Sequence, residues 1–179
     1  MLQSSSPIGV MDSGIGGLTV VRELQRILPG EDIIYFGDSA NCPYGNKTAD
    51  QIFELSCHML RFLGDNGVKC TAIACNTIST MAERLRPCFD YKIISIVEAA
   101  ANYVIREKLK SVGLIATEFT VASGKYAELI HAGAPDCHVV GKGSPQLAAL
   151  VDRGDFNQHD INLEIKTQVD NILAREPVK

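Results

Sequence analysis

Short apolar runs alternate with longer amphipathic runs along most of this chain. Residues 8–11, 32–36 and 69–74 are mostly apolar and have the length of buried strands, whereas 16–28 and 48–64 repeat apolar residues at helical spacing. This alternation predicts parallel sheets with helices on both faces, because parallel strands need a crossover connection. The expected fold class is therefore α/β, with doubly wound parallel sheets.

The remaining runs continue the alternation in a second series. Strands are expected at 92–96, 112–115 and 137–140, and helices at 77–85, 99–108, 121–132, 145–153 and 159–174. Thr48 is expected to cap the helix that follows it. The two series predict two domains, residues 1–97 and 98–179.

Composition excludes several classes of protein. Of 179 residues, 46% are hydrophobic and 21% charged, which is typical of a globular chain. Seventeen Lys and Arg against 21 Asp and Glu give a net charge of −4, so nucleic acid is not an expected partner. No apolar run approaches the length of a membrane span. The polar residues 1–7 lack the basic start of a signal peptide, so a cytoplasmic protein is expected.

The chain has six cysteines. They form no Cys-x-x-Cys pair, and no histidine stands at zinc-ligand spacing from them. Free thiols without a metal site are therefore expected in this compartment. Four of the six suit the role of buried, unreactive side chains: Cys57, Cys70, Cys88 and Cys137.

Ligands of open parallel sheets bind at the carboxyl ends of the strands, so the loops there matter most. Asp-Ser-Gly-Ile-Gly-Gly at 12–17 lacks the third glycine of the dinucleotide fingerprint, where Thr19 stands, and the lysine of the P-loop. What remains is a tight turn that presents Asp12 and Ser13 at a strand tip. The plain structural alternative is a turn in which Asp12 caps the helix.

Two further loops have chemical potential. Pro43-Tyr44-Gly45 fixes the backbone and directs a hydroxyl and N–H groups that could hold a small carboxylate, although an ordinary surface turn has the same residues. Cys75 follows an apolar strand and precedes a helix, whose dipole lowers a thiol pKa. Asn76 and Thr77 add donors beside it, and an inert buried cysteine is the alternative.

These loops together resemble the glutamate racemases of the aspartate/glutamate racemase superfamily. The stretches that carry the resemblance are 8–20, 34–38, 43–45, 74–77, 115–117 with Thr120, 123–124, and 145–154. The resemblance implies interconversion of L- and D-glutamate without cofactor or metal, for the supply of peptidoglycan precursors. It also implies two cysteines, one on each face of the α-carbon, that remove and return the proton.

The resemblance also implies residue roles. Cys75 is the first cysteine, and Asp12 lies beside it, where it helps to ionise the thiol and meets the substrate ammonium. Ser13, Asn76 and Thr77 hold carboxylate oxygens, and Tyr44 and Gly45 hold the other carboxylate. Thr120 and Asp152 of the second domain are expected to contact these residues and not the substrate itself.

The chain departs from the family in its second half. The family's second cysteine lies in a Gly-Cys-Thr-His stretch, and none of the four histidines here follows Cys-Thr. Asp152 stands where the family usually has Glu, and Ser144 where a cysteine is common. The chain therefore resembles the first two-thirds of a racemase, and we expect an incomplete second domain and a C-terminal truncation.

Several functions stay open from the sequence. The first is a racemase with glutamate as its small-molecule substrate. The second is a catalytically incomplete fragment or a non-catalytic glutamate binder, and the third is a one-cysteine decarboxylase or proton-exchange relative. A cysteine hydrolase is a distant alternative, because no histidine stands in a motif of a catalytic base. A homodimer also stays open, since the sequence does not fix the oligomeric state.

Overall fold

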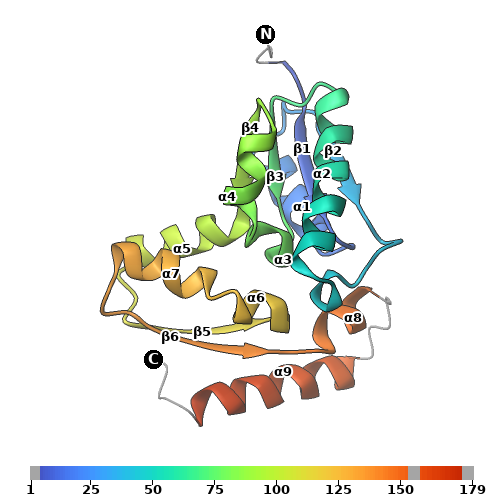
Figure 1. The fold of residues 1–179 in the computed structure, drawn as a ribbon. Helices are drawn as coiled ribbons and strands as arrows, with labels where there is room; N and C mark the ends of the chain where they lie inside the picture. Colours follow the sequence, from blue (N-terminus) through green and yellow to red (C-terminus); the bar gives the residue numbers. More distant parts are fainter. Residues whose placement is uncertain (1–4, 153–157, 175–179) are drawn as a thin grey trace. The chain divides into compact units, whose positions relative to one another are not determined.

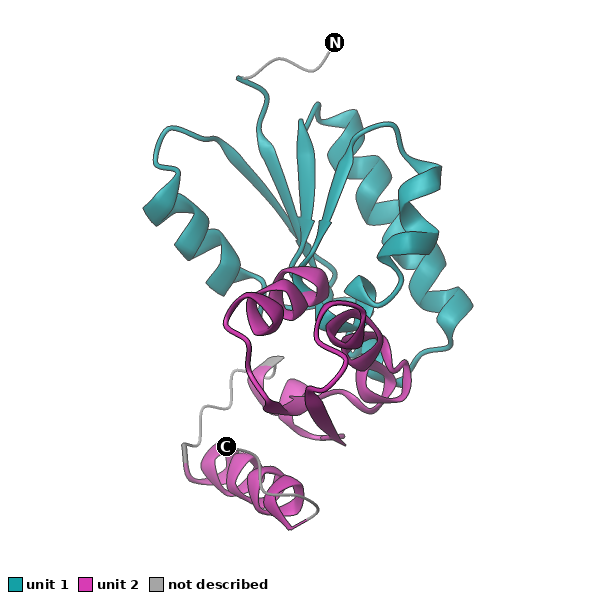
Figure 2. Cartoon of the chain, turned by 90° about the vertical axis from the view of Figure 1, so that its left-hand side faces the viewer, with its two compact units in different colours: residues 1–96 teal, residues 97–179 magenta. Residues whose placement is uncertain are grey.

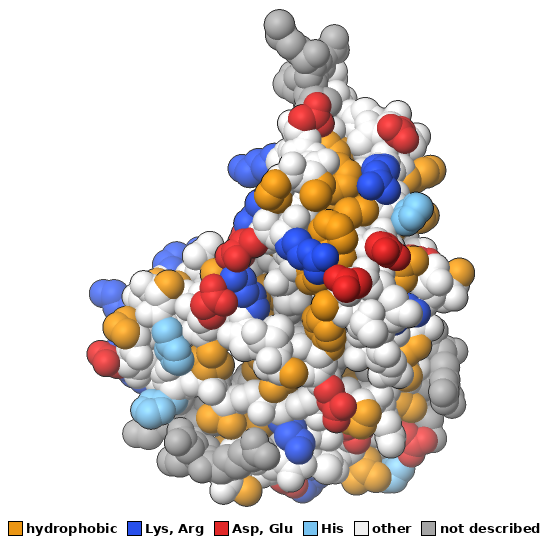
Figure 3. All heavy atoms as spheres, in the orientation of Figure 1, with side chains coloured by type: hydrophobic (Ala, Val, Ile, Leu, Met, Phe, Trp, Pro, Cys, Tyr) orange, Lys and Arg blue, Asp and Glu red, His pale blue; other side chains and the backbone are white. Residues whose placement is uncertain are grey.

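The computed structural model describes residues 5–152 and 158–174. The chain divides into two compact units, residues 1–96 and 97–179 (Figure 2). None of the helices in the described residues is long and apolar enough to cross a membrane. Figure 3 shows one face of the molecule, on which acidic and basic side chains are interspersed with hydrophobic ones.

The first unit is built on a four-stranded parallel sheet. Its strands are β1 (Ile8–Asp12), β2 (Ile33–Gly37), β3 (Cys70–Ile73) and β4 (Lys92–Ser95), in the order β2-β1-β3-β4. Helices cover both faces of this sheet (Figure 2). Every residue of β1 is buried, because β1 is paired on both edges and covered on both faces.

Helices and short turns connect these strands. They are α1 (Leu18–Ile27), α2 (Ala49–Asp65), α3 (Asn76–Ser79) and α4 (Ala82–Leu85), with short 3-10 helices η1 (Tyr44–Asn46) and η2 (Arg86–Cys88). Thr48 caps α2 as expected: its Oγ1 accepts from the N–H of Gln51, and the Gln51 side chain accepts from the N–H of Thr48.

The single helix expected at 77–85 is wrong, because the structure has two short helices, α3 and α4, in its place. Between them, the hydroxyl of Thr80 donates to the carbonyl of Thr77 at 2.8 Å. Such a local side-chain bond competes with helical hydrogen bonding, and a β-branched residue adds to the break. The helix that follows Cys75 is therefore only four residues long.

The second unit has a two-stranded parallel sheet, β5 (Ser111–Ala116) and β6 (His138–Gly143). Its helices are α5 (Ile96–Arg106, whose first residue belongs to the first unit), α6 (Glu118–Ala122), α7 (Lys125–Gly133), α8 (Leu147–Asp152) and α9 (Gln158–Leu173) (Figure 1). Helices α6 and α9 both pack on the sheet, at Gly141 and Gly113 respectively.

The helix expected at 121–132 is also divided, into α6 and α7. Gly124 lies between them with φ +67°, a left-handed conformation that glycine adopts without steric cost. The expected fold class is nevertheless confirmed, since both sheets are parallel and the crossovers are helical.

Candidate active site

The carboxyl ends of β1 and β3 lie side by side, because the two strands pair in parallel with Met11 opposite Ile73. Asp12 ends β1, and Cys75 follows β3 by two residues. The Oγ of Ser13 lies 3.3 Å from the Sγ of Cys75. Residues 62 positions apart are thus brought into contact at the sheet edge where ligands of α/β proteins bind.

The carboxylate of Asp12 closes the glycine-rich turn. Its Oδ2 accepts from the backbone N–H of Gly17 at 2.9 Å and of Gly14 at 3.3 Å, and the side chain is buried. The N-cap residue of α1 is Gly17, so Asp12 fixes the turn without being the cap residue itself. The alternative in which Asp12 caps the helix is therefore wrong, although its carboxylate closes the turn that also carries Ser13.

Cys75 is buried, with 6% of its surface exposed. Burial and, to a smaller extent, the negative charge of Asp12 raise the pKa of its thiol to about 11. The Ser13 hydroxyl and the backbone N–H groups of Ile78 and Ser13 act in the opposite direction, because they donate to the sulfur. The sulfur therefore sits among donors that favour the thiolate, within an environment that disfavours charge.

The expectation that Cys75 is an acidic thiol is wrong for this structure. That expectation depended on a helix from residue 77 to 85, whose N-terminus would stabilise the thiolate. Helix α3 has only four residues, so few peptide dipoles add up there, and burial outweighs them.

Tyr44 is placed differently from the expectation that its hydroxyl faces a ligand. Its side chain is 1% exposed, and its hydroxyl donates to the Oδ2 of Asp38 at 2.6 Å. Burial, followed by this bond to Asp38, raises the pKa of Tyr44. The backbone N–H of Asp38 in turn donates to the carbonyl of Asp12 at 3.0 Å, so Asp38 joins the second loop to the first.

Sequence reasoning missed the role of Asp38. A usable signal was its place directly after β2 and three residues before Asn41. The side-chain amide of Asn41 donates to both Asp38 oxygens at 3.0 Å.

The other expected residues of the first unit flank Cys75. Asn76 is exposed at the start of α3 and Thr77 is buried behind it, and Gly45 lies in η1, which contacts α3.

None of the six cysteines, all of which lie in the described residues, forms a disulfide bond. Cys57 and Cys137 are buried as expected, but Cys88 is exposed and Cys70 is only half-buried, so the expectation of burial is wrong for these two. Among the described residues, no group of three or more His, Cys, Asp or Glu side chains could hold a metal ion.

Residues 8–176 match the Asp/Glu/Hydantoin racemase family. This chain belongs to that family. Similar relatives include the glutamate racemase of Desulforudis audaxviator, 41% identical over 150 residues, and that of Bifidobacterium animalis subsp. lactis, 40% identical over 164 residues.

Those alignments cover 83% and 89% of this racemase-family chain, but 55% and 63% of the two relatives. Among solved structures, the glutamate racemase of Francisella tularensis in complex with D-glutamate superposes with a TM-score of 0.84 at 39% identity, covering 92% of this chain and 63% of that one. The Bacillus anthracis enzyme gives 0.85 at 31% identity, covering 97% and 64%. The chain thus spans less than two-thirds of the length of these relatives.

Two expected site residues belong to the second unit. Thr120 is buried in α6, where its N–H donates to Thr117 Oγ1 at 3.2 Å and the two hydroxyl oxygens are 2.9 Å apart. Asp152 is the last residue of α8, and its side chain lies outside the described part of the chain.

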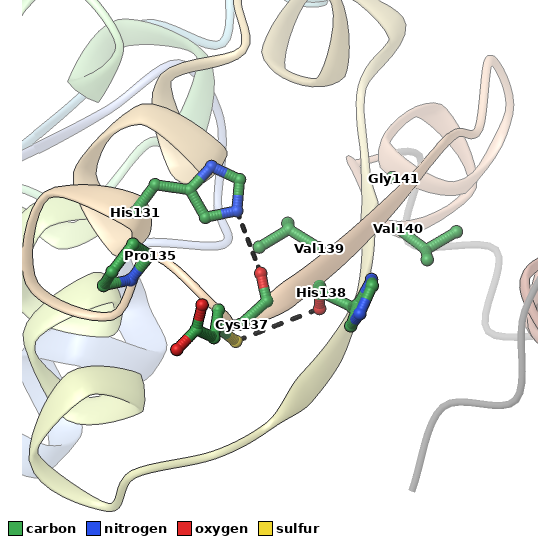
Figure 4. A pocket seen from close by; sticks show the side chains of 8 residues that line it. His131, Pro135, Cys137, His138, Val139, Val140 and Gly141 are labelled. Carbon is green, nitrogen blue, oxygen red and sulfur yellow. Dashed lines mark hydrogen bonds between the residues drawn. The ribbon is translucent and has the colours of Figure 1, made fainter.

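The second unit has an open pocket of about 720 Å³ (Figure 4). It is lined by residues of α7, β6 and the turn between them: His131, Pro135, Asp136, Cys137, His138, Val139, Val140 and Gly141. The Nε2 of His131 donates to the carbonyl of Cys137 at 2.9 Å. This pocket lies at the amino end of β6, which is the end opposite to the ligand-binding edge of a parallel sheet.

Proposed function

We propose that this chain carries the Asp12 and Cys75 half of a cofactor-independent glutamate racemase. In this proposal residues 1–97 are the first racemase domain, and 98–179 are part of the second, without the second-cysteine motif. The observation that carries the proposal is the contact of Ser13 with Cys75 beside the buried carboxylate of Asp12. Glutamate as the substrate is supported by relatives that are glutamate racemases, one of them solved with D-glutamate.

Cys75 would act as the base. Its thiolate removes the α-proton, so the C–H bond breaks, an S–H bond forms, and the electron pair stays on the substrate carbon and its carboxylate. A buried thiolate with a raised pKa is a strong base, which suits a weakly acidic C–H bond. The same raised pKa means that only a small fraction of Cys75 is thiolate at neutral pH.

Substrate binding would change this balance. An α-ammonium group placed beside Asp12 offsets the negative charge that raises the pKa of Cys75, and therefore promotes the thiolate when substrate is bound. Ser13, Asn76 and Thr77 would hold one carboxylate through their side-chain and backbone donors. Tyr44 and Gly45 would serve the other carboxylate through the backbone N–H groups at the start of η1, because the Tyr44 hydroxyl is bound to Asp38.

Proton return decides what the chain does unaided. The sequence has no Gly-Cys-Thr-His stretch that would supply an acid on the opposite face. We infer that a proton removed by Cys75 returns to the same face. The complete enzyme would supply D-glutamate for peptidoglycan precursors in the cytoplasm. A homodimer is one oligomeric state that fits this proposal.

Hydrogen exchange in deuterium oxide tests this function. With the 179-residue chain, proton NMR should show slow exchange of the α-hydrogen of one glutamate enantiomer, while polarimetry shows inversion near background. Cys75→Ala should abolish the exchange, and Cys57→Ala, which alters another buried thiol, should leave it unchanged.

The alternatives give different results. Rapid interconversion of both enantiomers would refute one-faced chemistry in this chain. Glutamate binding without any Cys75-dependent exchange would favour a non-catalytic binder, and release of carbon dioxide would favour a one-cysteine decarboxylase.

A further inference from the structure

Tyr35 reaches from β2 into the turn that carries Asp12 and Ser13. It lies opposite Val10 in the β1–β2 register, and its hydroxyl donates to the carbonyl of Gly14 at 2.7 Å. The ring is half-buried. A side chain in the middle of β2 thus holds the backbone of the site loop, although β2 itself supplies none of the expected site residues.

Two glycines show how tightly this contact is built. A Cβ atom at Gly37 would lie 2.5 Å from the Gly14 carbonyl oxygen and 3.1 Å from the Tyr35 hydroxyl. A Cβ atom at Gly17 would lie 3.0 Å from the Tyr35 ring and 2.7 Å from the Cβ of Asp12. The Tyr35 side chain is therefore enclosed between two backbone segments that approach more closely than any larger residue allows.

The Gly14 carbonyl, which accepts the Tyr35 hydrogen bond, belongs to the turn that contacts the sulfur of Cys75. The N–H of Gly14 donates to Asp12, and the preceding residue, Ser13, places its Oγ 3.3 Å from Cys75. The hydroxyl bond of Tyr35 fixes one side of Gly14 while the carboxylate of Asp12 fixes the other. Ser13 directly precedes Gly14, so its orientation toward the sulfur depends on both bonds.

We propose that Tyr35 is a positioning residue of the Cys75 site, which orients Ser13 toward the sulfur by holding the carbonyl of Gly14. The proposal rests on the proposed function of Cys75 and names no new group that touches the substrate. Its physical content is that a hydroxyl on a neighbouring strand sets the donors around the reacting thiol.

Tyr35→Phe is the direct test, and Tyr91→Phe is its matched control. Tyr91 is also half-buried and also donates to a backbone carbonyl, that of Leu60 at 2.6 Å, but it precedes β4 at the opposite end of the sheet. Hydrogen–deuterium exchange should show the amides of Gly14 and Gly17 exchanging about threefold to tenfold faster in Tyr35→Phe only, as expected for the loss of one hydrogen bond.

The second readout is the chemistry of the thiol. Iodoacetamide reacts with the thiolate, so its rate at Cys75 follows the thiolate fraction below the pKa. Tyr35→Phe should slow the labelling of Cys75 about threefold to tenfold across a pH series, because the Ser13 donors are no longer aligned. Labelling equal to or faster than that of Tyr91→Phe would overturn the proposal.

Gly37→Ala gives an independent route to the same change. Its new methyl group would displace the Gly14 carbonyl from Tyr35, whereas Gly30→Ala meets nothing within 4 Å and is the control. Gly37→Ala should reproduce both effects of Tyr35→Phe. If Gly37→Ala alters neither readout, the position of the Gly14 carbonyl does not control the reactivity of Cys75.

The two proposals fail in different ways. If the unaltered chain shows no Cys75-dependent α-hydrogen exchange, the proposed function fails while the labelling comparison can still be read. If exchange occurs and Tyr35→Phe matches Tyr91→Phe in both readouts, the positioning role fails and the proposed function stands.

Discussion

Strands β1 and β5 hold similar places in their units but have different surroundings. Each is the first strand of its unit and pairs in parallel with the next strand along the chain. In the described residues, β1 also pairs with β3 and is wholly buried, whereas β5 pairs with β6 and is half-buried along most of its length. The strand that delivers Cys75 in the first unit, β3, has no counterpart among the described strands of the second.

This difference explains why the proposed chemistry is one-sided. A reactive group at the tip of a parallel sheet needs a strand to deliver it and a neighbouring loop to supply its donors. The first unit meets both needs with β3 and the turn after β1. The described part of the second unit shows two strands, and the relatives extend over a length that this chain does not span.

The largest expected effect tests the difference in packing. Leu60→Ala removes a fully buried side chain of α2 and should destabilise the first unit by about 2–5 kcal/mol. Leu114→Ala in half-buried β5 should cost only about 1 kcal/mol, because less surface and a smaller cavity are involved. Urea unfolding gives the total loss, and amide exchange in β1 and β5 assigns it to a unit. Equal losses would remove the distinction between the two strands.

The second test concerns the charge beside Cys75. Asp12→Asn keeps an oxygen acceptor for the turn but removes the negative charge that raises the pKa of the thiol. The sign follows directly: a lower pKa gives more thiolate at a fixed pH, so iodoacetamide should label Cys75 about threefold to tenfold faster. Labelling of Cys137 in the second unit should not change. Slower labelling of Cys75 would mean that Asp12 promotes ionisation, as the family resemblance implies.

The sequence was sufficient to predict the alternation of strands and helices, the cap at Thr48 and the neighbourhood of Asp12 and Cys75. These features follow from local patterns and from the rule that ligands meet the carboxyl ends of parallel strands. It was not sufficient for the pKa of Cys75 or the contact of Tyr44. Both depend on how deeply a side chain is buried and on which residue faces it, and no spacing along the chain encodes that.

Two helix breaks were missed for a related reason. Apolar periodicity continues through Thr80 and through Gly124, so the pattern predicts one helix where the structure has two. A side-chain bond decides the first break and a left-handed glycine decides the second. Tyr35 was missed as well, because an aromatic residue within a predicted strand is ordinary and only the fold reveals its reach to Gly14.

A third prediction compares glycines in the two units. Gly67 after α2 and Gly124 before α7 both have positive φ, and a Cβ at either would meet nothing within 4 Å. Alanine at each should therefore cost about 1 kcal/mol from backbone strain alone. Urea unfolding checks the loss, and Asn, which tolerates this conformation better, should recover part of it. A much larger loss at one site would show that its unit cannot adjust the backbone locally.

The smallest expected effect concerns helix caps. Thr48→Ala removes the capping-box bond that the Thr48 hydroxyl accepts from the N–H of Gln51 at the start of the 17-residue α2, and keeps the bond that the Thr48 N–H donates. It should cost the first unit about 1 kcal/mol. Thr117→Ala removes the cap of the five-residue α6 and should cost about 0.5 kcal/mol, because the short helix depends less on its first turn than on its packing against β6. Serine at either position keeps the hydroxyl and is the control. Exchange of the Gln51 and Thr120 amides, which the two caps bind, locates each loss. A greater loss at Thr117 would reverse the comparison, since it would make the cap of α6 a main support of the half-buried sheet.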